Sequence, residues 1–108
     1  MPRIVRYVLA KTKPGVNRDD YERFEREVDY VICREIKSIV SYRTHRITEL
    51  GEKLAPGGWD YIERIEITDR AAYEAELAEK GKKLLDELYS KYLDRQYTTS
   101  VWSELVEP

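Results

Sequence analysis

The chain has 108 residues, a mass of 12.8 kDa and a formal net charge of −2, with 19 basic and 21 acidic side chains. This length predicts a single domain over residues 1–108 and excludes an enzyme with separate nucleotide-binding and substrate domains. The near balance of charge argues against a nucleic-acid-binding protein, because such proteins carry a concentrated basic excess.

The apolar runs are far shorter than the ~20 residues of a membrane-spanning helix. Residues 1–3 lead directly into strand-like sequence rather than into a secretory signal. We therefore expect a soluble, cytoplasmic protein with no membrane partner. A single cysteine, Cys33, excludes an intrachain disulfide, and a single histidine, His45, excludes the usual cysteine and histidine zinc sites. The sequence thus argues against zinc and redox chemistry and predicts no metal site.

The first half of the chain predicts a strand, a helix and a second strand. Residues 3–10 alternate like a strand with apolar side chains on both faces. Asn17 is a suitable N-cap for a helix, in which apolar residues recur at spacings of three and four up to Ile36. The alternating charges within residues 19–27 indicate a solvated face of this helix. Residues 38–48 are rich in β-branched and aromatic residues and predict the second strand.

The second half predicts a loop over residues 49–58, a third strand over 59–67 and a last strand over 98–106. Between these two strands, Thr68 or Asp69 can cap a helix that Gly81 stops or kinks, and a further apolar stripe predicts another helical segment. The order is β-α-β-β-α-β with an extra helical segment before the last strand. This is the ferredoxin-like arrangement of the α+β class.

The helices can cover only one face of such a four-stranded antiparallel sheet. The first and third strands are apolar on both faces, and an uncovered apolar face marks an interface or a ligand site. We therefore expect a homodimer in which two sheets face each other and enclose a cavity.

Four segments carry a resemblance to a known family. They are Lys-Pro-Gly-Val at 13–16, Glu-Val-Asp-Tyr-Val-Ile-Cys-Arg at 27–34, Ser-Ile-Val-Ser-Tyr-Arg-Thr-His-Arg at 38–46 and Trp-Asp-Tyr-Ile-Glu at 59–63. With these segments in order, the chain resembles the dimeric α/β barrel superfamily, and within it the REDY-like proteins typified by the HapK family of natural-product pathways.

The resemblance implies cofactor-independent chemistry on small aromatic or polyketide-like intermediates. Dehydration, cyclisation or isomerisation is implied for the REDY-like branch, and oxygenation for some relatives. Many relatives of the EthD and monooxygenase kind carry a histidine near the end of the first helix. In this sequence the corresponding stretch contains Asp29, which becomes the candidate in place of the histidine.

Three residues are candidates for proton transfer: His45, Asp29 and Glu63. Histidine is the residue type whose unperturbed pKa lies near neutrality, which makes His45 the natural acid or base. Asp29 lies in an apolar stretch of the helix, and Glu63 lies on a strand beside that of His45, where the two could pair. Each has an ordinary alternative: a partly exposed structural imidazole, a solvated helix carboxylate and a surface ion pair, respectively. Cys33 lies in an apolar helical stretch and is expected to be inert packing.

Aromatic usage favours a cavity that is both apolar and hydrogen-bonding, since nine tyrosines and two tryptophans stand against one phenylalanine. Tyrosines filling strand and helix boundaries would give the same composition. We expect the following residues to contact a small aromatic substrate: Tyr7, Tyr30, Tyr61, Trp59, Trp102 and Arg43.

Three functions remain open: a lyase or dehydratase, a cofactor-free monooxygenase, and a non-catalytic small-molecule-binding protein. An RNA-recognition domain, which shares the strand order, is excluded because the third strand carries acids where such domains need rings and bases.

Overall fold

The computed structural model describes residues 3–49 and 58–108. Within these residues, one antiparallel sheet has the strand order β2-β3-β1-β4. Its strands are β1 (Ile4–Ala10), β2 (Ile39–Arg46), β3 (Tyr61–Ile67) and β4 (Thr99–Glu104). This is the α+β ferredoxin-like arrangement that the sequence predicts.

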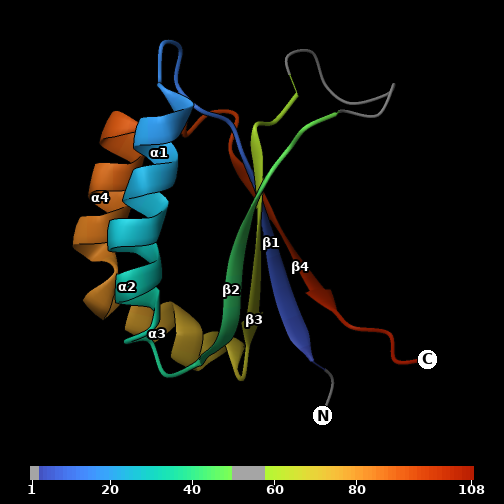
Figure 1. Cartoon of the computed structure of the whole chain (residues 1–108). Coiled ribbons are helices and arrows are strands. Elements are labelled where there is room, and N and C mark those ends of the chain that lie inside the picture. Colours follow the sequence, from blue (N-terminus) through green and yellow to red (C-terminus); the bar gives the residue numbers. More distant parts are fainter. Residues whose placement is uncertain (1–2, 50–57) are drawn as a thin grey trace.

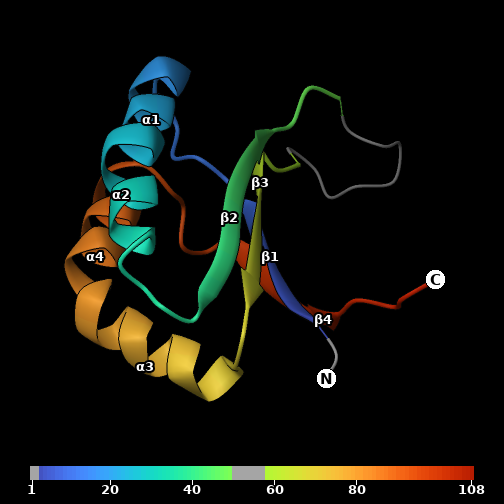
Figure 2. The same ribbon diagram turned by 60° about the horizontal axis from the view of Figure 1, so that its bottom comes forward.

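The helices all lie on one face of the sheet (Figure 1). They are α1 (Arg18–Phe24), η1 (Glu25–Asp29), α2 (Tyr30–Cys33), α3 (Arg70–Lys80) and α4 (Lys82–Lys91). The rotated view in Figure 2 shows the same two layers, with the opposite face of the sheet uncovered by any helix of the described residues. None of these helices has the length and apolar character needed to cross a bilayer.

The first helical stretch begins at the predicted cap. Asn17 Oδ1 accepts hydrogen bonds from the backbone N–H groups of Asp19 and Asp20, at 2.8 and 3.2 Å. The stretch is not one regular helix, however, because its middle part, η1, is a π-helix in which the Tyr30 N–H donates to the Glu25 carbonyl. Such wider turns are rare and frequently occur at functional sites.

The second helical region is divided where the sequence predicts, at Gly81. The Gly81 N–H donates to the Leu77 carbonyl at 2.8 Å, and α4 begins at the next residue. A Cβ atom on Gly81 would lie 2.7 Å from Leu77 Cδ1 and 2.8 Å from the Leu77 carbonyl oxygen. The bend between α3 and α4 therefore requires a residue without a side chain.

Gly81→Ala is expected to lower the free energy of unfolding by about 1–3 kcal/mol, the usual cost of forcing an atom into a packed site. At an unobstructed helical position the same change would instead stabilise the protein by about 0.5–1 kcal/mol. Urea denaturation shows directly whether the free energy of unfolding falls or rises. The reverse change Ala75→Gly, at an exposed position in α3, calibrates the helix-propensity effect. A stabilised Gly81→Ala variant would contradict the close contact with Leu77.

The core lies between the two layers and is formed by alternate strand residues. Val8, Ala10, Tyr61, Ile65 and Ile67 of β1 and β3 pack against buried helix residues, among them Tyr21, Phe24, Leu84 and Leu88. Because side chains alternate along a strand, the residues between them point to the open face. That open face includes Tyr7, Leu9, Ile62, Arg43, His45 and Val101.

Candidate functional site

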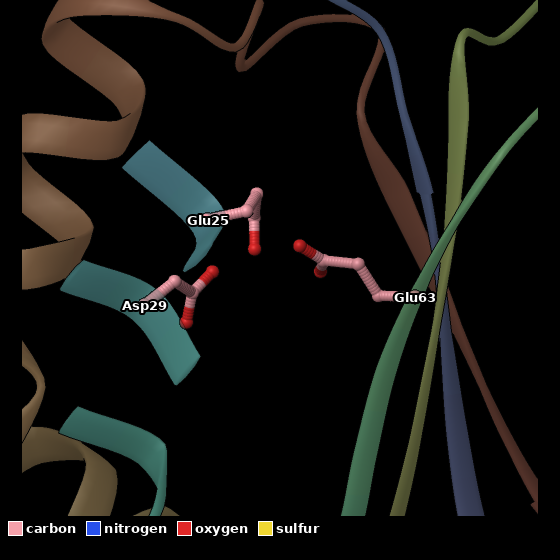
Figure 3. A group of neighbouring side chains, drawn as sticks. All are labelled: Glu25, Asp29 and Glu63. Carbon is pink, nitrogen blue, oxygen red and sulfur yellow. The ribbon is translucent and has the colours of Figure 1, made fainter. Parts of the chain in front are cut away.

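Three buried carboxyl groups meet between the helices and the sheet. Glu25 and Asp29 come from η1 and Glu63 comes from β3, and Figure 3 shows the three side chains converging. Only 2, 3 and 4% of these residues is exposed, and one oxygen of each lies within 4.8 Å of the others. None of the ion pairs among the described residues involves them. Buried carboxyl groups without a cation must be neutralised in another way, most simply by protons.

Tyr42 of β2 makes short contacts with two of these carboxyl groups and a longer one, of 3.4 Å, with Glu25 Oε2. Its Oη atom lies 2.8 Å from Asp29 Oδ2 and 2.7 Å from Glu63 Oε1. A phenol carries one proton and can donate to only one of the two, so the other carboxyl group must be protonated and donate to the phenol oxygen. The Cys33 thiol also donates to Asp29, with Sγ 3.2 Å from Oδ1. This pattern suits Asp29 as the acceptor and Glu63 as the protonated acid.

The environment of the cluster favours protonated glutamates. Burial, followed by the negative charge of Asp29, raises the pKa of Glu63 to about 8. Burial and then the neighbouring Glu63 and Asp29 charges raise the pKa of Glu25 still further above its usual range. Burial also raises the pKa of the Cys33 thiol far above its usual value, which makes this thiol unreactive. At neutral pH the cluster therefore holds protons out of contact with bulk water.

A cavity of about 250 Å³ adjoins the cluster on the helix side of the sheet. Asp29, Tyr42 and Glu63 form one part of its wall. The rest is largely apolar or aromatic, with Val8, Ile65, Leu84, Leu88, Tyr73 and Tyr89, and it also includes Arg6 and Arg95. This mixture of apolar walls with a few polar groups is typical of small-molecule sites. The expected cavity was one between the sheets of two copies, whereas this cavity lies within one chain.

The structure brings together two of the three predicted proton-transfer residues. The register of β2 and β3 places His45 opposite Ile62 and Glu63 opposite Thr44. Since side chains alternate along a strand, His45 points to the open face while Glu63 points to the helices. His45 is exposed, and the pairing of His45 with Glu63 that neighbouring strands would allow does not form.

None of the six residues expected to contact substrate lines this cavity. Two of them, Tyr30 and Trp102, contact residues that do. Tyr30 covers the cluster from the side of β2, since its ring stands edge-on to Tyr42 at 5.2 Å and its hydroxyl accepts from the Thr44 N–H at 2.7 Å. Trp102 packs against Tyr73, which does line the cavity.

The other four of these residues have different surroundings. Tyr61 donates its hydroxyl proton to Glu22 at 2.7 Å, and Trp59 Nε1 donates to the Tyr97 carbonyl at 2.9 Å. Tyr7 and Arg43 are on the open face. These four side chains therefore make their contacts outside the cavity.

Sequence reasoning missed Glu25, Tyr42, Arg6 and Arg95. Glu25 belongs to the charged stretch 19–27 that was expected to be solvated, and its burial corrects that expectation. A signal was present, because Glu25 precedes Asp29 by four residues and so shares a helix face with it. Tyr42 alternates in phase with Thr44 and out of phase with His45, which places it on the opposite face from His45.

The same three carboxyl groups could hold a divalent cation. Their oxygens lie within 4.8 Å of one another, and carboxylate oxygens are the ligands that magnesium and calcium prefer. The short contacts of Tyr42 and the raised glutamate pKa values describe a cluster already neutralised by protons, which a cation would have to displace. A chelator distinguishes these two states.

Comparison with known proteins gives a consistent picture. The family model of the REDY-like protein HapK matches residues 4–106. The crystal structure of HapK from Hahella chejuensis superimposes with a TM-score of 0.73 at 24% identity, covering 100% of this chain and 95% of that chain. No curated protein matches the chain.

More distant relatives share the fold. An ethyl tert-butyl ether D (EthD) family protein from Bacillus halodurans has a TM-score of 0.69 at 12% identity, covering 96% of this chain and 99% of its own. A dimeric ferredoxin-like protein of unknown function from Thermobifida fusca has a TM-score of 0.66 at 15% identity, and the match covers 97% of this chain and 93% of that chain.

Proposed function

The chain belongs to the family of the REDY-like protein HapK, and on this basis we propose that it is a lyase, dehydratase or cyclase that transfers protons on a small aromatic molecule without a cofactor. The observation that carries the proposal is the pair of short contacts from Tyr42 to Asp29 and Glu63. They join a proton acceptor to a proton donor at the wall of a cavity. Paired carboxyl groups in different protonation states are the arrangement that acid–base catalysis needs.

A dehydration illustrates the division of work. The Asp29 carboxylate removes a proton from a substrate carbon, and Glu63, protonated at neutral pH, gives its proton to the departing hydroxyl group. The C–O bond breaks, a C=C bond forms and water leaves. Asp29 now carries a proton and Glu63 has lost one, and Tyr42 lies between them at 2.8 and 2.7 Å. The proton can return through the phenol and restore the starting state.

This function is tested with small aromatic compounds that carry a hydroxyl group two carbons from a carbonyl. The purified protein is incubated with them in D₂O, and proton NMR follows exchange of the hydrogen beside the carbonyl and loss of water. We expect both reactions, unchanged by EDTA and without oxygen uptake. Oxygen consumption would instead indicate a cofactor-free monooxygenase, and saturable binding with neither reaction would indicate a small-molecule-binding protein.

We also propose that the protein is a homodimer joined through the open sheet face. Half of Val101 on β4 is exposed there, close to other apolar side chains of that face, and a solved relative is described as dimeric. Sedimentation equilibrium at micromolar concentration is expected to give twice the 12.8 kDa chain mass. Val101→Glu should shift the protein toward monomer because it buries a charge in the interface.

The matched control is Val106→Glu, which places the same charge on a residue that is 90% exposed outside the sheet. It should leave the dimer intact. A wild-type monomer, or equal effects of the two substitutions, would contradict an interface on the open face.

A further inference from the structure

Arg6 of β1 brings a positive charge to the cavity wall, and the proton-transfer scheme does not use it. Its Nη1 donates to the Tyr73 hydroxyl at 3.0 Å, and its guanidinium carbon lies 5.7 Å from the centroid of a Trp102 ring. Its Nε is buried and has no hydrogen-bond partner. A buried N–H group without a partner is rare in a folded protein, so this atom calls for an acceptor.

The free edge of this guanidinium has the shape that binds a planar oxyanion. Arg3 and Arg46 each use Nε and Nη2 together to hold a carboxylate, that of Glu66 and that of Glu22. In Arg6 the bond to Tyr73 occupies Nη1, whereas Nε has no acceptor. Such two-point contacts between arginine and a carboxylate are strong and directional.

The carboxyl cluster does not supply an ion-pair partner for the Arg6 guanidinium. The strand register places Arg6 opposite Ile65 and Glu63 opposite Val8, so the two residues are diagonal neighbours on the same sheet face. Nevertheless, no ion pair joins Arg6 to Glu63 or Asp29 within the described residues. The positive and negative groups therefore face one cavity as separate binding points.

Arg95 supplies a second guanidinium at the same cavity. It lies after α4, is exposed, and holds its guanidinium carbon 4.2 Å from the centroid of the Tyr89 ring, which is also in the cavity wall. An exposed cation at the rim attracts an approaching anion, while the half-buried Arg6 lies deeper.

We propose that the cavity takes an anionic substrate, a planar molecule whose carboxylate or enolate oxygen binds the free edge of Arg6 after capture by Arg95. The apolar body then packs against Val8, Ile65, Leu84 and Leu88, with its reacting carbon toward Asp29. The placement of the reacting carbon rests on the proposed function, whereas the binding of the oxyanion does not.

The probes are 2-naphthoate and 2-naphthamide, which have nearly the same shape and differ in charge. Isothermal titration calorimetry on the wild-type protein is expected to show at least about tenfold tighter binding of the acid, which corresponds to about 1.4 kcal/mol. Arg6→Gln should remove this preference, and Arg6→Lys should restore only part of it because an ammonium group lacks the fork. Arg95→Gln should weaken the binding of the acid less than Arg6→Gln does.

The matched control is Arg64→Gln, on the open face of neighbouring β3, which removes the same charge and should keep the preference. Equal wild-type affinity for acid and amide would overturn the proposal, and so would a preference that survives in Arg6→Gln. If Arg6→Gln unfolds, the Arg6→Lys and Arg95→Gln titrations decide the matter, since unchanged preference in both overturns it. Acid-selective binding without proton exchange would remove the proposed function alone, and turnover of neutral compounds without acid preference would remove this proposal alone.

Discussion

Asp29→Asn is expected to lower the rate of substrate proton exchange by about 10²- to 10⁴-fold, the usual contribution of a general base. The amide has nearly the same shape as the carboxyl group, and its single oxygen can still accept one of the two hydrogen bonds that Tyr42 and Cys33 donate to different oxygens of Asp29. It cannot take up a proton at neutral pH. The measurement is the rate of deuterium incorporation into the substrate, followed by NMR.

The control for this prediction is His45→Ala. The imidazole is exposed on the open face, so its removal should leave the exchange rate close to that of the wild type. Glu63→Gln should remove water loss more than proton exchange, because it deletes the donor and keeps the base. Urea denaturation of each variant verifies that the protein is folded. A folded Asp29→Asn protein with wild-type exchange would show that the cluster does not perform the reaction.

The free energy of unfolding is expected to fall as the pH rises from about 5 to 8. The pKa of Glu63 is raised from 4.5 to about 8 in the folded protein, chiefly by burial. The folded protein therefore keeps a proton that the unfolded chain has lost across this interval. The stability from the protonated group is complete below the ordinary pKa and is lost as the pH rises through the raised one. One such group gives a slope of about −1.4 kcal/mol per pH unit.

Glu25 adds to this slope, because its pKa is raised in the same direction. The measurement is a series of urea unfolding curves between pH 5 and 9. Glu63→Gln should flatten the dependence, since its amide does not titrate. Glu27→Gln, at an exposed position of the same helical stretch, should leave the slope unchanged. Stability that rises over this range would contradict protonated buried glutamates.

Much of the fold could be predicted because local patterns and tertiary structure agree. The Asn17 cap, the Asp69 cap, the break at Gly81 and the alternation along the strands all have direct counterparts in hydrogen bonds and pairing. Each depends on a few neighbouring residues, which the sequence displays. The order of elements then leaves few arrangements beyond the ferredoxin-like sheet.

The candidate site was less predictable because it depends on register and on a local irregularity. A shift of one residue exchanges the two faces of a strand, and the bulge between Ile39 and Ser41 alters the phase at the start of β2. Spacings of three and four along residues 21–28 fit an α-helix as well as the π-helical turn that is present. Asp29 was found by its place in an apolar helical stretch, and Glu63 by a pairing with His45 that does not form. Their partner Tyr42 required the strand pairing.

The π-helical turn also bears on how such a site could be gained or lost during evolution. A π-turn contains one residue more than the α-helical path it replaces, so it can arise by a single-codon insertion and disappear by a single-codon deletion. Removing one exposed residue of η1, such as Glu27, would let this turn close to a regular α-helix while the helical parts on either side keep their orientation. Glu25 and Asp29 would then be three residues apart instead of four, which changes how their carboxyl groups meet Glu63 while the cap and the sheet stay as they are. Ancestry and activity can thus diverge in this fold through one codon, with no side chain substituted.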